Sequence, residues 1–190
     1  MNVYKNCPQF SNAKYCLRLI EKPDTQDLLK VYSDVDAVKL FNCDNCHGDD
    51  FYYTTFERMQ QAVDFWVEAY ANGWFVRWSV VDNANGSVIG TIEAFRRDAE
   101  DYFTDCALLR LDLRSDYEKS DEIESIMSLI AEPSLNLFGC SMVATKAIAK
   151  ATERIAALNK LGFVCAKEKL VGHDGTQYGD YFVLRKNMVK

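Results

Sequence analysis

The middle of the chain contains three apolar runs of strand length, and turn residues join the first two. Residues 75–81 and 87–95 flank Asp-Asn-Ala-Asn-Gly at 82–86, a composition typical of a β-hairpin turn. Residues 106–113 form the third run, which is apolar enough to lie at the centre of a sheet. A chain with three such runs in its centre has to cover the resulting sheet with other elements.

Amphipathic helical patterns precede and follow these strands. They begin near residues 24, 54, 115 and 152, and further strand patterns lie at 15–20, 140–146, 163–171 and 178–186. A capping box at Ser115–Glu118 predicts one helix that Pro133 ends. This order predicts a single α+β domain over residues 1–190, with a mixed central sheet and helices on both faces.

Charge and composition exclude several classes of partner. The net charge of −6 would repel phosphate backbones, so we expect no nucleic-acid binding. No apolar run approaches the roughly 20 residues that cross a bilayer, so we expect no membrane partner. The first residues have no apolar signal core, and most of the seven cysteines are isolated in apolar runs. These features predict a cytoplasmic protein.

Three landmarks then follow in order: Tyr-Cys-Leu-Arg-Leu-Ile at 15–20 before a capped helix, Asn-Gly-Ser-Val-Ile-Gly-Thr-Ile at 85–92, and Asn-Lys-Leu-Gly-Phe at 159–163. Together they resemble the GCN5-related N-acetyltransferase (GNAT) family, and most closely its ribosomal-protein N-terminal acetyltransferase branch. The resemblance spans about residues 15–186. It implies an acyl-CoA-dependent N-acyltransferase that moves an acetyl group from acetyl-CoA directly to the amine of a small molecule or peptide.

The resemblance also implies where the cofactor and the chemistry lie. In the family, acetyl-CoA occupies a split between two parallel strands, here 106–113 and 140–146, and its pyrophosphate meets backbone N–H groups at a helix start. The implied CoA contacts are Leu111, Leu113, Arg114, Tyr117, Lys119, Ser120 and Lys146. Glu93 is the implied general base that keeps the amine neutral, with Asp105 as a second candidate.

The turn at 114–122 departs from the family's glycine-rich Q/R-x-x-G-x-G/A pattern. Tyr117 and Lys119 occupy the glycine positions, and four acids in the first helical turns would repel a pyrophosphate: Asp116, Glu118, Asp121 and Glu122. Ala151 and Arg154 stand where the family has an Asn and a Ser near CoA. A second hypothesis therefore stays open, namely a non-catalytic binding module that keeps the fold and has lost the CoA cradle.

Residues 43–47, Cys-Asp-Asn-Cys-His, match the C-x-x-C-H pattern of haem attachment. The flanking residues are polar, and His173 is the only other histidine, so we expect neither haem nor a bound metal. The loop is predicted to lie near the acceptor mouth, and a redox pair has no further support. Aromatic residues between 56 and 78 are expected in the core, with an aromatic-lined acceptor pocket as the alternative. The sequence indicates neither the acceptor's identity nor the oligomeric state.

Overall fold

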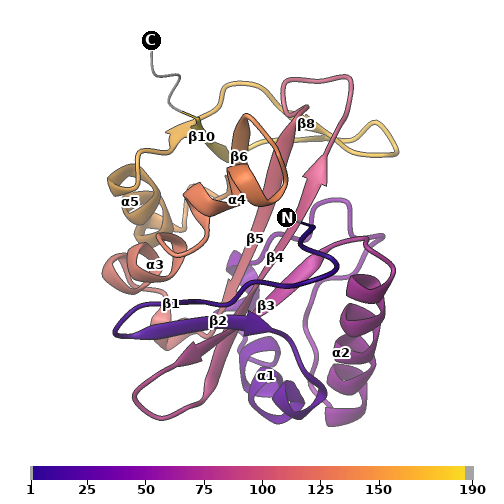
Figure 1. Cartoon of the computed structure of the whole chain (residues 1–190), viewed down its shortest axis with the longest axis vertical. Helices are drawn as coiled ribbons and strands as arrows, with labels where there is room; N and C mark the ends of the chain where they lie inside the picture. The colour runs from indigo at the N-terminus through magenta and orange to yellow at the C-terminus, as the bar shows by residue number, and fades with distance from the viewer. Residues whose placement is uncertain (1, 187–190) are drawn as a thin grey trace.

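The computed structural model describes residues 2–186, which fold around one eight-stranded sheet of order β1-β2-β3-β4-β5-β6-β10-β7 (Figure 1). Its strands are β1 (Phe10–Ser11), β2 (Tyr15–Leu19), β3 (Val76–Asp82), β4 (Val88–Arg97), β5 (Cys106–Leu113), β6 (Met142–Lys146), β7 (Val164–Cys165) and β10 (Tyr181–Arg185). The pair β5–β6 is parallel and the other pairs are antiparallel. A separate hairpin joins β8 (Leu170–Val171) to β9 (Gln177–Tyr178).

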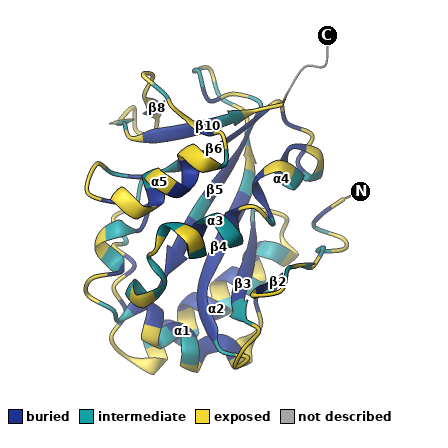
Figure 2. Ribbon diagram, turned by 90° about the vertical axis from the view of Figure 1, so that its left-hand side faces the viewer, coloured by how far each residue is buried: buried dark blue, intermediate teal, exposed yellow. Residues whose placement is uncertain are grey.

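Helices cover both faces of the sheet, which confirms the predicted fold class. They are α1 (Thr25–Tyr32), α2 (Phe56–Ala71), α3 (Ser120–Met127), α4 (Ala131–Leu137) and α5 (Thr152–Lys160). One apolar core lies between the sheet and α3, α4 and α5, and a second contains residues of α1 and α2. The central strands are buried along most of their length, while the outer helix surfaces are exposed (Figure 2). None of the described helices is long and apolar enough to cross a membrane.

Three helix boundaries differ from the sequence prediction. The Ser115–Glu118 segment is a 3-10 turn (Ser115–Tyr117), and α3 begins only at Ser120. Pro133 does not end a helix, because it lies in the first turn of α4, where its missing N–H has no intrahelical partner to lose. In α2 the N-cap is Thr55 rather than Thr54, with the hydroxyl of Thr55 accepting from Arg58 N.

The alternation of side chains along the three central strands separates two kinds of buried residue. On β3, Val76, Trp78 and Val80 pack in the core beneath α3 to α5. Arg77 lies between them in sequence, so its side chain points to the opposite face, towards α1 and α2. The same period of two places Glu93 on β4 and Arg110 on β5 on that face. The sheet therefore carries a layer of charged side chains under α1 and α2.

Gly90 on β4 offers a direct test of this packing. A Cβ added there would lie 2.2 Å from the Asp112 carbonyl oxygen and 2.7 Å from Leu113 Cδ2, both on β5. Because the closest contact is backbone, we expect Gly90→Ala to lower the free energy of unfolding by about 1–3 kcal/mol or more, measured by urea denaturation. Gly179→Ala is the control, since a Cβ there meets nothing within 4 Å. Equal stabilities of the two variants would contradict the strand spacing described here.

Candidate binding site

Glu93 lies between two arginines on neighbouring strands. Sheet register puts Glu93 directly opposite Arg77 on β3 and directly opposite Arg110 on β5. Arg77 Nη2 donates to one carboxylate oxygen of Glu93, and Arg110 Nη1 donates to the other at 2.8 Å. The Arg77 and Glu93 side chains are almost entirely buried, and only 11% of the Arg110 side chain is exposed. Burial alone would raise the pKa of Glu93, but the two guanidinium charges hold it below its ordinary value.

A second buried acid lies behind Arg77. Asp112 on β5 accepts from Arg77 Nη1 at 3.2 Å and from the Tyr32 hydroxyl at 2.7 Å, both through Oδ2. Burial raises the pKa of Asp112 despite these partners. Arg77 also stacks on the Trp66 ring of α2, with Cζ 4.0 Å from the ring centroid. The charged layer is thus fixed both within the sheet and against α2.

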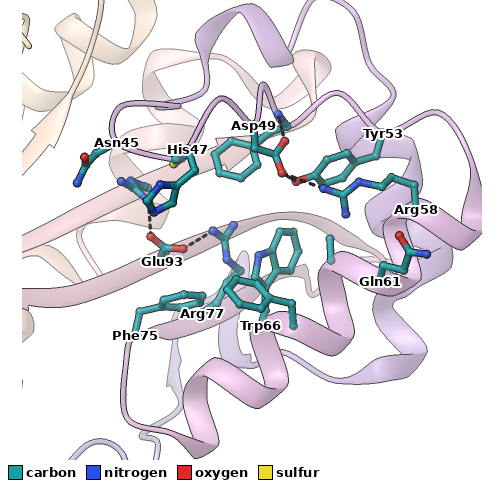
Figure 3. A pocket seen from close by; sticks show the side chains of 15 residues that line it. Asn45, His47, Asp49, Tyr53, Arg58, Gln61, Trp66, Phe75, Arg77 and Glu93 are labelled. Carbon is teal, nitrogen blue, oxygen red and sulfur yellow. Dashed lines mark hydrogen bonds and ion pairs between the residues drawn. The ribbon is translucent and has the colours of Figure 1, made fainter. Parts of the chain in front are cut away.

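A cavity of about 270 Å³ opens above this layer (Figure 3). Its deep end carries Arg77, Glu93 and Arg110, its walls are aromatic, and its roof is the loop before α2. The lining residues are Asn45, Cys46, His47, Asp49, Phe51, Tyr53, Arg58, Gln61, Ala62, Phe65, Trp66, Phe75, Arg77, Glu93 and Arg110. As expected, Trp66 and Trp78 are buried in the core, and Trp66 and Phe75 also line this cavity, whereas Phe56 and Trp74 are exposed.

The roof loop is held in a costly backbone conformation. Asn45, His47 and Phe51 all line the cavity and have positive φ, at 61°, 54° and 57°. The left-handed region is especially unfavourable for a bulky residue such as Phe51 and costs about 1–3 kcal/mol per residue. Asp49 braces the loop, since its Oδ2 accepts from the Tyr53 hydroxyl and from Arg58 Nη2, each at 2.8 Å. Strain of this kind is concentrated at ligand and active sites.

The two cysteines of this loop are neutral thiols. Burial raises the pKa of Cys43 to about 12 and also raises that of Cys46. A thiol rather than a thiolate is a poor nucleophile and a poor metal ligand. Within residues 2–186, no group of three or more His, Cys, Asp or Glu side chains is arranged to hold a metal ion. Cys46 and His47 contribute to the roof of the cavity instead.

On the other side of β5, the side chain of Arg154 lies in the gap between β5 and β6. The two strands pair in parallel only as far as Leu109 and Thr145. Beyond that point Arg154 Nη1 donates to the Leu111 carbonyl of β5 at 2.8 Å and to the Leu40 carbonyl at 3.0 Å. Its remaining guanidinium nitrogens bind the Glu118 carboxylate, and both side chains are more than nine-tenths buried.

Several backbone N–H groups of the turn before α3 have acceptors within the chain, whereas those of Asp121 and Glu122 in its first turn have none among the described residues. Ser115 N donates to Asp34 Oδ2 at 2.9 Å, and Ser120 N donates to Glu153 Oε2 at 2.7 Å. The intervening N–H groups of residues 117–119 donate to backbone carbonyls. Two carboxylates of the chain thus hold N–H groups of the turn to which the resemblance assigns a pyrophosphate.

Several residues implied as CoA contacts also bind within the chain. Lys146 donates to both carboxylate oxygens of Asp44 at 2.7 Å, and Arg114 is paired with Asp116. The Tyr117 hydroxyl donates to Asp82. Leu111 and Leu113 are buried in the core, and neither they nor Lys119 and Ser120 line the cavity above Glu93.

The structure does not bring the two candidate bases together. Glu93 lies at the base of the cavity, whereas Asp105 precedes β5 and pairs with Arg96 at 2.9 Å outside it. Arg77 and Arg110, which flank Glu93, were not singled out from the sequence. A signal was present, because the apolar runs 75–81 and 87–95 each contain one charged residue and 106–113 contains two, although these strands are apolar enough to be central.

Comparisons with known proteins identify the fold. No protein-family model and no curated protein matches the sequence significantly. Among solved structures, a GNAT-family acetyltransferase from Bacillus anthracis has a TM-score of 0.68 and 13% identity, covering 94% of this chain and 98% of its own. The chain has the GNAT acetyltransferase fold. This confirms the fold implied by the three sequence landmarks.

Two further solved structures with this fold have described activities. The ribosomal-protein-S5-alanine acetyltransferase from Vibrio fischeri has a TM-score of 0.63 and 19% identity, covering 96% of this chain and 99% of its own. The spermidine N-acetyltransferase from Vibrio cholerae, in complex with CoA and spermine, has a TM-score of 0.64 and 12% identity, covering 92% and 96%. Structural neighbours of the chain are thus acetyltransferases, and one of them holds CoA.

The residues of the β5–β6 gap do not fit CoA. Arg154, paired with Glu118, donates to the carbonyl of Leu111, a residue that the resemblance assigns to the cofactor. Two N–H donors of the turn, those of Ser115 and Ser120, are already bound by carboxylates. Moving Arg154 out would leave Glu118 as a buried, uncompensated charge, which is strongly unfavourable.

The Glu93 cluster leads to a stability prediction. We expect Glu93→Gln to lower the free energy of unfolding by about 3–5 kcal/mol at neutral pH, because Arg77 and Arg110 would then lack a buried counter-charge. The control is Glu100→Gln, at an exposed loop residue, with an expected change below about 0.5 kcal/mol. Urea denaturation measures both variants.

The same variant predicts a dependence on pH. The pKa of Glu93 in the folded chain lies below its ordinary value of 4.5, so the unfolded state binds more protons as the pH falls. The stabilisation is complete above about pH 4.5 and is lost as the pH drops through the lower folded pKa. We therefore expect the stability difference between wild type and Glu93→Gln to shrink below about pH 4.5. A difference that stays constant down to pH 3 would contradict the ion-pair assignment.

Proposed function

We propose that the chain is a non-catalytic small-molecule-binding protein that uses the GNAT fold without acyl-CoA chemistry. The observation that carries the proposal is Arg154, whose buried guanidinium occupies the gap between β5 and β6. Asp34 and Glu153 add to it, because they satisfy N–H groups that a pyrophosphate would need. By contrast, the cavity above Glu93 has a strained roof and aromatic walls, features typical of a ligand site.

An acyl-CoA-dependent N-acyltransferase is the second candidate. Its support is the likeness over 92% of the chain to a spermidine N-acetyltransferase in complex with CoA and spermine. In that case Glu93 would be the general base, with a peptide or small-molecule amine as the acceptor. A carboxylate that accepts from two guanidinium groups is a weak base, however, because its pKa is lowered rather than raised towards neutrality. The geometry therefore favours the binding protein.

The cellular location is part of the same proposal. All seven cysteines are free thiols, and Cys106 and Cys140 are buried. Free thiols support a reducing compartment, and we propose the cytoplasm.

Acetyl-CoA binding distinguishes the two candidates. A ligand at 100 times its Kd stabilises the native state by about 2.7 kcal/mol, which corresponds to a rise in Tm of roughly 5–10 °C for a chain of this size. For the wild-type chain with about 1 mM acetyl-CoA, we expect a rise below about 1 °C. The Vibrio cholerae spermidine N-acetyltransferase serves as the positive control. A rise of 5 °C or more in the wild-type chain would favour the acyltransferase.

A double variant tests whether Arg154 is what prevents acetyl-CoA from binding. Arg154→Ser with Glu118→Gln removes both buried charges together, so neither remains unpaired. We expect this variant to gain a Tm rise with acetyl-CoA that exceeds that of the wild type. The control, Lys22→Ser with Asp64→Asn, removes an exposed ion pair away from this turn and is expected to gain nothing. If acetyl-CoA raises the Tm of both double variants equally, Arg154 is not what prevents acetyl-CoA from binding.

A further inference from the structure

The charge at the base of the cavity is opposite in sign to that of the whole chain. The chain carries a net charge of −6, yet the deep end of the cavity combines two guanidinium groups, Arg77 and Arg110, with one carboxylate, Glu93. Both oxygens of Glu93 already accept from the arginines. The local sum is one positive charge, and the side chain that remains partly exposed there is Arg110 rather than Glu93.

Neither of the neighbouring acids is an unpaired charge at the cavity. Asp112 is fully buried behind Arg77 and does not line the cavity, and its Oδ2 accepts from Arg77 and from the Tyr32 hydroxyl. Nearer the mouth, Asp49 is paired with Arg58 at 2.8 Å, so these two residues sum to zero.

Arg110 has donors to spare. It has five N–H groups, of which Nη1 donates to Glu93 and Nη2 donates to the Asp44 carbonyl. Nε is inaccessible, so the donors available to a ligand are the second N–H groups of Nη1 and Nη2, on a side chain that is 11% exposed and lines the cavity. Such donors gain from a ligand that supplies acceptors. Carboxylates do so with strong, charge-assisted geometry.

The walls define the rest of the ligand. Trp66, Phe75 and Phe51 surround the deep end, and Figure 3 shows the Trp66 and Phe75 rings on either side of the Arg77 side chain. Arg77 fills the space between these two rings, and flat apolar groups pack favourably against the aromatic walls that remain open to the cavity. The volume of about 270 Å³ lies near the lower end for small-molecule sites, so the ligand is small.

We propose that this cavity binds a small organic carboxylate, with the carboxylate at Arg110 beside Glu93 and a flat apolar body against the aromatic walls of the cavity. A cationic amine would instead meet a net positive charge. A phosphate dianion would exceed the single positive charge available to it. This ligand class rests on the proposed binding function and specifies its site.

Probes that share one phenyl ring and differ in charge test the proposal. Phenylacetate, phenylacetamide, phenethylamine and phenyl phosphate are titrated at pH 7 by calorimetry, up to about 10 mM, where even a millimolar ligand is largely bound. We expect phenylacetate to bind at least about tenfold more tightly than the amide, and the amine to bind most weakly. An amine or phosphate that binds as tightly as phenylacetate would overturn the proposal, and so would the absence of binding by all four probes.

Variants at Arg110 test whether this side chain contacts the carboxylate of the ligand. We expect Arg110→Gln to reduce phenylacetate affinity at least about tenfold and to leave phenylacetamide affinity almost unchanged. Arg110→Lys, which keeps the charge, is expected to recover part of the loss. Arg185→Gln removes the same charge from the exposed end of β10 and is the control, and circular dichroism verifies that each variant is folded. Equal losses for the acid and the amide in Arg110→Gln would mean a packing role and would overturn the assignment.

The two proposals fail in different ways. If phenylacetate and phenylacetamide bind equally in the wild type, the carboxylate assignment fails, while small-molecule binding stands. If acetyl-CoA raises the Tm of the wild-type chain by 5 °C or more, the proposed function fails regardless of the probes.

Discussion

The buried carboxylate of Glu93 is the interaction on which the central sheet depends. It faces Arg77 and Arg110 across two strand pairs, and all three side chains lie on the face that α1 and α2 cover. Without this carboxylate, two guanidinium groups would repel each other where water cannot screen them. A slip of one residue in β4 would move Glu93 to the opposite, apolar face, so the ion pairs also fix the register.

Ion pairs give the two sides of β5 different properties. On one side Glu93 holds its arginines below an open cavity, and Arg110 keeps unused donors there. On the other side Arg154 and Glu118 satisfy each other and two backbone carbonyls in the gap before β6. The fold is that of acetyltransferases. The polar groups on the two sides of β5 nevertheless differ, because the chain itself satisfies those in the β5–β6 gap and leaves donors of Arg110 unused at the cavity. Function follows these groups rather than the fold.

The sequence predicted much of the architecture because its signals are local. The Asp-Asn-Ala-Asn-Gly turn, the apolar run at 106–113 and the three landmarks were sufficient for the mixed sheet and the fold. The 115–130 segment was predicted as one helix, since its apolar spacing continues through Ile130. The structure breaks it on both sides of α3 (Ser120–Met127), at Glu118 and at Ile130, where the backbone is not helical. Local spacing alone does not register such breaks.

The sequence by itself determined the order of elements, the acidic turn without glycine and the alternation that puts Arg77, Glu93 and Arg110 on one face of a strand each. Only the tertiary structure decided that these three meet, because strand register is set by pairing between distant segments. The contacts of Arg154 were also decided only by the tertiary structure, because the helical pattern of the sequence shows no more than that Arg154 lies on α5. Its place beside Leu111 depends on how α5 packs over the gap between two strands, a long-range arrangement that no local pattern encodes.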